Sequence, residues 1–191
     1  MQDKLRSSAD QSKYVAIGTC GLDYDRLFDG CSQQDQAMVF EKHFELAEEF
    51  KLPMYFHVRS AFDDFVDLLG RNRGKFSRGM VHCFTGSASE LQALLKMDLF
   101  IGVTALSFRT EENLEMVKQI PLEKLLIATN GPFSSMNPNF AGFEFVKTQF
   151  KTSEKEDYTA GAEELVRARN EPCCIVQTIE VLAALFGMSE E

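Results

Sequence analysis

Short apolar runs alternate along the chain with longer stretches that are apolar on one helical face. The apolar runs predict five buried strands, at 14–18, 52–58, 79–84, 99–103 and 125–129. The stretches between them predict helices at 33–51, 61–71, 89–97 and 111–119. Strands that alternate with helices pair in parallel through right-handed crossovers, so the pattern predicts an α/β fold.

The alternation stops after residue 130, and a long loop at 131–170 precedes one last helix. A connection of this length is usually functional or partly disordered. Asn170 is predicted to cap the last helix, with Glu171 and Pro172 suited to its first turn. The phenylalanines of the loop are predicted to pack it down rather than to stack on bases: Phe133, Phe140, Phe143, Phe145 and Phe150.

Length and composition predict one domain. The chain has 191 residues, of which 45% are hydrophobic, including 17 Phe. We expect a single packed domain at 14–187, preceded by a polar lead at 1–13 and followed by a tail at 188–191. A closed eight-stranded α/β barrel usually takes about 250 residues, so this length accommodates only part of one.

The charge balance limits how the chain could meet nucleic acid. There are 20 Lys and Arg residues against 29 Asp and Glu residues, which gives a net charge of −9. Binding through many phosphates needs clustered cations, so this balance argues against a protein that holds nucleic acid on a broad basic surface. A nuclease that meets phosphate through a bound metal ion is not.

Cysteine usage and hydropathy bear on the compartment. The five cysteines form no CxxC pair, and an odd number makes a poor disulfide framework. We therefore expect a reduced protein of the cytoplasm or the nucleus. The polar start of the chain predicts no secretion signal, and no run approaches the 18 or so apolar residues of a membrane span.

Four polar residues stand where predicted strands end: Thr19, His57, His82 and Asn130. An α/β enzyme usually builds its site at such positions, so these are the candidate site residues. Each has a structural alternative. A histidine among apolar residues is commonly a hydrogen-bonded core group, Thr19 is a good strand former, and Asn130-Gly131 is a turn dipeptide.

Other polar residues near these positions have two interpretations each. Arg59 and Ser60 precede a predicted helix and could bind phosphate, whereas Arg59 could instead pair with a nearby acid. The segment 85–87 could line an anion pocket or make an ordinary N-cap turn. Asp23 could anchor a loop over the site, and His43 is predicted to be structural or solvent-facing.

Five motifs, in this order, resemble the TatD-type deoxyribonucleases over about residues 14 to 187. They are AIGTCGLDY at 16–24, LPMYFHVRS at 52–60, VHCFTGS at 81–87, IATNGP at 127–132 and RNEP at 169–172. One such motif would be a weak signal, whereas five in register identify the family.

The resemblance implies a TIM-like barrel that hydrolyses DNA phosphodiesters with a divalent metal (Mg, Mn or Zn), often as an exonuclease. It places His57 and His82 on metal ligands of the family. Thr19 falls where the family has a metal-bridging Glu. Asn130 falls at the catalytic Asp, which also binds metal and handles the proton of the attacking water.

The chain departs from the family in its histidines and its extent. The family's first strand carries a His-x-His pair, which is absent here. By the same resemblance, we expect the chain to begin just before the family's fourth strand and to stop before its C-terminal segment. About five parallel strands, matching strands four to eight, then form an incomplete barrel. A second copy or another partner is expected to cover the exposed sheet, and the uncovered chain to aggregate.

The substitutions at Thr19 and Asn130 also change the predicted chemistry. Carboxylates hold Mg²⁺ or Mn²⁺ and offset the charge of these ions, and the metals then activate water. Two imidazoles without carboxylates suit a single Zn²⁺, Ni²⁺ or Cu²⁺ instead. Hydrolysis is therefore expected to be absent or reduced by orders of magnitude. The alternatives are a residual nuclease, a pseudoenzyme that binds nucleic acid or protein, and a remnant with no function of its own.

Overall fold

The computed structural model describes residues 13–27, 30–159, 161 and 163–189. The chain divides into two compact units. The first comprises Met1–His82 and Ser89–Ile101, and the second comprises Cys83–Ala88 and Gly102–Glu191. None of the described helices combines the length and the apolar character that a membrane crossing needs.

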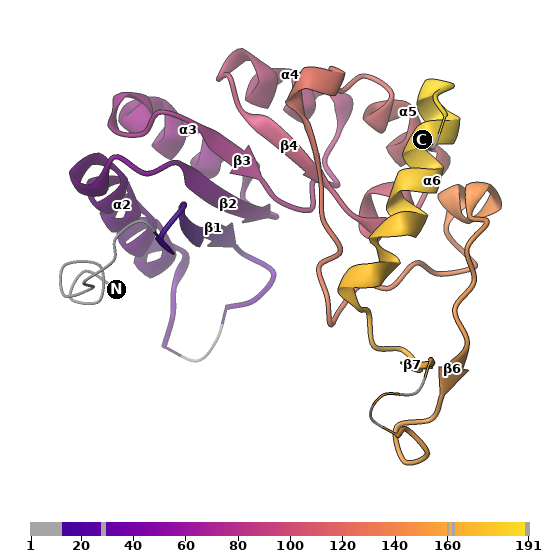
Figure 1. Ribbon diagram of the computed structural model, residues 1–191. Helices are drawn as coiled ribbons and strands as arrows, with labels where there is room; N and C mark the ends of the chain where they lie inside the picture. The colour runs from indigo at the N-terminus through magenta and orange to yellow at the C-terminus, as the bar shows by residue number, and fades with distance from the viewer. Residues whose placement is uncertain (1–12, 28–29, 160, 162, 190–191) are drawn as a thin grey trace. The chain divides into compact units, whose positions relative to one another are not determined.

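The first unit is built from alternating strands and helices (Figure 1). This alternation confirms the α/β fold predicted from the sequence. In chain order its elements are β1 (Ile17–Asp23), α2 (Gln33–Phe50), β2 (Met54–Arg59), α3 (Phe62–Asn72), η2 (Arg73–Lys75), β3 (Gly79–Val81), α4 (Ala88–Lys96) and the start of β4 (Phe100–Val103).

The second unit is less regular and contains several single turns of 3₁₀ helix. Its longest element is α6 (Ile175–Phe186), which follows the loop predicted at 131–170. That loop carries structure that the sequence did not predict, because η5 and a small parallel sheet of β6 and β7 lie within it. The other elements are η3 (Ala105–Phe108), α5 (Glu111–Val117), η4 (Leu122–Lys124), β5 (Leu125–Ile127), η5 (Ala141–Phe145), β6 (Thr152–Ser153), β7 (Leu165–Val166) and η6 (Pro172–Cys174).

Five strands form one sheet in the order β1-β2-β3-β4-β5, as expected for part of a parallel barrel. The pairs β1–β2, β2–β3 and β3–β4 are parallel. β1 begins later than the predicted strand at 14–18 and runs on to Asp23. Gly18 is opposite Tyr55 and Cys20 is opposite Phe56, so Thr19 is an extra residue in a bulge.

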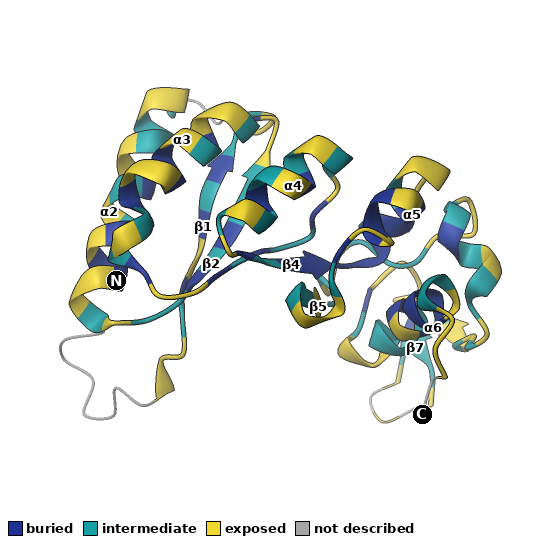
Figure 2. Ribbon diagram, turned by 90° about the horizontal axis from the view of Figure 1, so that it is seen from above, coloured by how far each residue is buried: buried dark blue, intermediate teal, exposed yellow. Residues whose placement is uncertain are grey.

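The first unit is held together by phenylalanine rings. Phe40 stacks on Phe65 with centroids 5.6 Å apart, and Phe56 meets Phe65 edge-on at 5.7 Å. Phe44 and Phe76 complete the cluster, and all five residues are buried. Figure 2 shows dark blue, buried segments on α2, β2 and α3. Helix α2 begins with a capping box, because Ser32 and Asp35 each accept a hydrogen bond from the other's backbone amide.

The prediction that Asn170 caps the last helix is wrong. The N-cap residue of η6 is Glu171, which makes no side-chain cap, and α6 continues from that turn. The Asn170 amide instead donates to the carbonyl oxygens of Thr129 at 2.6 Å and Phe133 at 2.8 Å. Local sequence favours capping, but these two carbonyls come from a segment about forty residues away in the chain.

A candidate site at the ends of the strands

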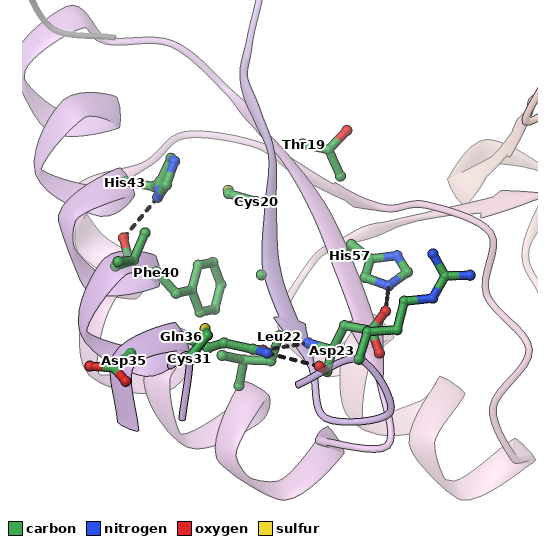
Figure 3. Close-up of a pocket in the computed structure, with 13 residues that line it drawn as sticks. Thr19, Cys20, Leu22, Asp23, Cys31, Asp35, Gln36, Phe40, His43 and His57 are labelled. Atoms are coloured by element: carbon green, nitrogen blue, oxygen red, sulfur yellow. Dashed lines mark hydrogen bonds and ion pairs between the residues drawn. The ribbon is translucent and has the colours of Figure 1, made fainter. Parts of the chain in front are cut away.

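The first unit contains a pocket of about 490 Å³ between β1 and α2. Thr19 and His57 both line it, and Figure 3 shows their side chains with those of Cys20 and His43. Burial raises the pKa of the Cys20 thiol to about 12, so this thiol stays protonated at neutral pH. His43 is placed as predicted for a structural residue, with its ring Nδ1 2.8 Å from the carbonyl oxygen of Val39.

The path of β1 brings the pocket residues together. Thr19 is exposed on the bulge, and Gly21 lies opposite His57 with φ at +145°. A Cβ atom at position 21 would collide with the carbonyl oxygen of His57, so only glycine allows the two backbones to approach this closely. Because Gly21 lies opposite His57, Thr19 lies on one side of this point along β1 and Asp23 lies on the other.

His57 is oriented by a carboxylate that is itself fixed. Its Nε2 lies 3.5 Å from Oδ2 of Asp23 (Figure 3). The backbone of Asp23 makes a reciprocal pair with the side chain of Gln36, whose Oε1 accepts from the Asp23 amide at 2.8 Å. The Gln36 Nε2 donates to the Asp23 carbonyl at 2.9 Å. Asp23 thus connects α2 to His57, which agrees with the anchoring role considered for it.

His82 is held by a different kind of partner. Its Nδ1 is hydrogen-bonded to the hydroxyl of Tyr55 at 2.6 Å, and the two rings are 5.2 Å apart. Tyr55 and His57 are two residues apart on β2, so their side chains leave the same face of the sheet. The His82 amide also donates to the carbonyl of Phe56, at the point where β3 has just ended.

Arg59 and Ser60 meet an acid of the chain itself. The Arg59 Nε lies 2.8 Å from Oδ2 of Asp25. The Ser60 hydroxyl bonds the same carboxylate and, together with Arg59, holds the pKa of Asp25 below its usual value. The acid-pairing alternative for Arg59 is therefore present in the structure, and a phosphate would have to compete with Asp25.

Asn130 lies in the second unit, at the start of a tight turn spanning 129–134. It has a positive φ of 62°, and its Nδ2 donates to the Ser134 hydroxyl at 3.0 Å. Asn170 fixes the turn from behind, because its backbone amide bonds the Pro132 carbonyl at 3.0 Å and its side chain bonds those of Thr129 and Phe133. The turn role of Asn130-Gly131 is therefore observed.

The described residues do not fit the metal centre that the resemblance implies. No three His, Cys, Asp or Glu side chains among them come together in a group that could hold an ion. His57 and Asp23 supply two donors, and the protonated thiol of Cys20 adds none. Thr19 offers only a hydroxyl, which is a poor ligand for a hard divalent cation. A divalent metal therefore has no adequate set of ligands among these side chains.

Sequence reasoning missed the partners rather than the candidates. Tyr55, Gln36 and Asn170 each fix a candidate residue or its backbone, and none was assigned that role. The spacing of Tyr55 and His57 on one strand was a usable signal for a shared face. No local signal reveals that Tyr55 faces His82, because this depends on how β2 and β3 are paired.

Comparisons with known proteins agree on one family. The model of the TatD related DNase family matches residues 1–191. The chain is 40% identical to the "Deoxyribonuclease Tat-D" of Schizosaccharomyces pombe, covering 98% of this chain and 62% of the relative. It is 32% identical to the "3'-5' ssDNA/RNA exonuclease TatD" of Yersinia pseudotuberculosis, covering 96% and 63%.

Solved structures give the same result. A TatD family hydrolase from Entamoeba histolytica superposes with a TM-score of 0.87 at 32% identity, covering 94% of this chain and 59% of that protein. An uncharacterized amidohydrolase from Saccharomyces cerevisiae gives 0.86 at 32% identity, covering 99% and 64%. The chain thus spans about three fifths of the length of the relatives it matches.

Proposed function

This chain belongs to the TatD-related DNase family, and on that premise we propose that it engages nucleic acid through the histidines of its first unit but hydrolyses it poorly. The observation that carries the proposal is the weak set of metal donors. The resemblance implies that Thr19 and Asn130 fall at the family's Glu and Asp positions. No cluster of three His, Cys, Asp or Glu side chains that could hold an ion occurs among the described residues. The names of the relatives support nucleic acid as the ligand.

The retained residues are suited to binding and to proton handling. Asp23 orients the His57 ring, and the Tyr55 hydroxyl orients that of His82. An imidazole that is held in one orientation can present a ring N–H to a phosphate oxygen. Because Thr19 and Asn130 carry no charge, neither position supplies a carboxylate to remove the proton of an attacking water.

The metal implied by the family, Mg, Mn or Zn, would be a poor fit as the chain stands. When such an ion is bound in a hydrolase, it polarises the phosphate and lowers the pKa of a coordinated water. We propose that His57 and His82 instead contact the phosphate group directly, with Arg59 available once it leaves Asp25. Binding without cleavage is therefore the second candidate, and the orientation of the two imidazole rings by Asp23 and Tyr55 supports it.

The test is metal-dependent release of nucleotides from a labelled DNA strand. The native chain is compared with the double variant Thr19→Glu/Asn130→Asp, which restores both carboxylates, and with His57→Ala as the matched loss. We expect the native chain to be nearly inert and the double variant to cleave faster by about a hundredfold or more, as restoring a principal catalytic group does.

Each outcome decides between the candidates. Cleavage by the double variant that His57→Ala abolishes supports a site that has lost only its ligands. If neither protein cleaves while both bind the strand, binding alone is the function. Rapid cleavage by the native chain contradicts the assignment of Thr19 and Asn130 as lost ligands.

We also propose that a second copy or another partner covers the edge of the sheet at β1. This strand stands at the end of the sheet order, and Val15, next to it in the chain, is 76% exposed. Light scattering over a range of concentrations tests self-association.

All five cysteines are free thiols, in keeping with a cytoplasmic or nuclear protein, which fractionation of cells would check.

A further inference from the structure

A second pocket lies within the second unit, and none of its lining residues is a candidate ligand named above. It has a volume of about 480 Å³ and is formed by the 134–152 segment, β7 and the start of α6. We propose that this pocket holds one unstacked nucleobase of a bound single strand. The inference rests on the proposed function in one respect, namely that nucleic acid is the ligand.

The size and the apolar lining of the pocket suit a base. Pockets for small molecules begin at about 300 Å³, so a single nucleobase with part of its sugar fits this volume. Phe143, Phe150 and Met136 contribute two aromatic rings and a thioether to the lining. Each phenylalanine is only partly buried, so these rings offer faces on which a base could stack.

Polar groups in the lining remain available for the edge of a base. Neither Gln149 nor Ser135 makes a side-chain hydrogen bond to any residue that the structure describes. An amide and a hydroxyl both donate and accept, so together they can meet the mixed donors and acceptors of a base edge. Gln177 is less available, because its Nε2 already donates to the Thr148 carbonyl at 2.9 Å.

The charges around the pocket favour a nucleotide over a cation. Arg169 is the single charged residue that lines it, and no carboxylate lines it. Its guanidinium is 5.5 Å from the ring centre of Tyr158, and its Nε bonds Glu171 at 2.6 Å. Lys151 lies between the lining residues Phe150 and Thr152 and forms no ion pair within the described chain. Its positive charge, like that of Arg169, favours an anionic ligand.

The pocket adjoins the turn that carries Asn130. Ser134 lines the pocket, and its hydroxyl accepts the hydrogen bond from the Asn130 side chain. A nucleotide with its base in the pocket would therefore place its sugar and phosphate near Asn130, which falls at the family's catalytic Asp. The pocket would thus set which nucleotide of the strand is next to this turn.

The test measures binding in the presence of a chelator, so that neither metal nor cleavage contributes. The probe is a fluorescein-labelled oligothymidylate of about twelve nucleotides, followed by fluorescence anisotropy. Phe150→Ala removes a stacking face, and Phe133→Ala is the matched control, since Phe133 is in the same unit, 71% exposed and outside the pocket. Loss of one stacked base should weaken binding about tenfold for Phe150→Ala and leave Phe133→Ala unchanged.

A second variant protects the test against a folding defect. Gln149 is exposed, so Gln149→Ala should fold normally and still lose affinity, by about threefold to tenfold. Equal affinity of the native chain, Phe150→Ala and Gln149→Ala overturns the inference but leaves nucleic-acid binding in place. If the native chain binds no oligonucleotide, both the inference and the proposed engagement of nucleic acid fail.

Discussion

The two units keep their interiors together by different means. In the first unit, five phenylalanine rings from two helices, a strand and a loop pack against one another. In the second unit, buried polar side chains tie irregular backbone to regular elements. Asn170 holds the turn at 129–134, and Glu180 on α6 accepts hydrogen bonds from the backbone amides of Lys147 and Thr148. Apolar packing stabilises the regular elements of the first unit. In the second unit, these two buried polar side chains, here called polar clamps, fix the shape of irregular segments.

The largest effect is expected from a cut into the aromatic cluster. Phe56→Ala removes a fully buried ring that contacts Phe40, Phe44, Phe65 and Phe76. The free energy of unfolding should fall by about 3–5 kcal/mol, because a cavity remains where the ring was. Urea unfolding followed by circular dichroism measures this loss. Phe133→Ala, at an exposed ring, should cost far less, and similar losses for both would refute the cluster as the main support.

Removing a polar clamp should cost somewhat less. Asn170→Ala leaves the carbonyl groups of Thr129 and Phe133 without their donor in a buried place. The expected loss is about 2–3 kcal/mol, as for buried groups that lose a hydrogen-bond partner. Faster amide hydrogen exchange at Phe133, whose amide bonds the Asn130 carbonyl, would localise the loss to the turn. Unchanged exchange there would mean that the turn does not depend on Asn170.

The second clamp should reveal itself through pH. Burial alone would raise the pKa of Glu180, but hydrogen bonds from Thr148 and Lys147 hold it below its usual value. A carboxylate whose pKa is lowered by folding stabilises the fold above its unfolded pKa of about 4.3 and loses that contribution as the pH falls through the folded value.

Glu180→Gln should therefore reduce stability at neutral pH by about 1 kcal/mol and flatten its decline below about pH 4. Thermal unfolding of both proteins between about pH 3 and pH 7 provides the measurement. Glu156→Gln is a suitable control, because Glu156 is exposed and belongs to the same unit. Parallel pH curves for the native chain and Glu180→Gln would contradict the clamp.

The smallest effect is expected at the ion pair of Arg59 and Asp25. Both side chains are substantially exposed, at 48% and 43%, so water and salt screen the attraction. Arg59→Gln should leave the unfolding midpoint unchanged within error in moderate salt. A clear loss of stability that persists in high salt would show that this pair supports the strand end after all.

The sequence was a good guide to elements whose signal is local. The predicted helix at 33–51 matches α2 (Gln33–Phe50), since the helical spacing of apolar residues lies within the segment and the N-cap Ser32 directly precedes it. β1 was placed too early, because its later part depends on a bulge at Thr19 and on close approach to β2. The prediction that Asn170 caps a helix was wrong for a similar reason, because its hydrogen-bond partners are distant in sequence.

The candidate site divides along the same line. Polar residues at predicted strand ends nominated Thr19 and His57, which line one pocket, although both lie within their strands rather than at the ends. The pairings of His57 with Asp23 and of His82 with Tyr55 require the strand register, which no local pattern contains. Their roles in function, and that of Asn130, stay predictions until the cleavage assay is done.

The division into two units also affects what intrinsic fluorescence reports, because the tyrosines are unequally shared between the units. The chain has no tryptophan and four tyrosines, of which Tyr14, Tyr24 and Tyr55 belong to the first unit and Tyr158 to the second. The tyrosine fluorescence of the protein therefore reports chiefly on the first unit. The variant Phe186→Trp on α6 would add a tryptophan signal from the second unit. Thermal unfolding of one sample, followed by both signals, would then show whether the two units unfold together or one after the other.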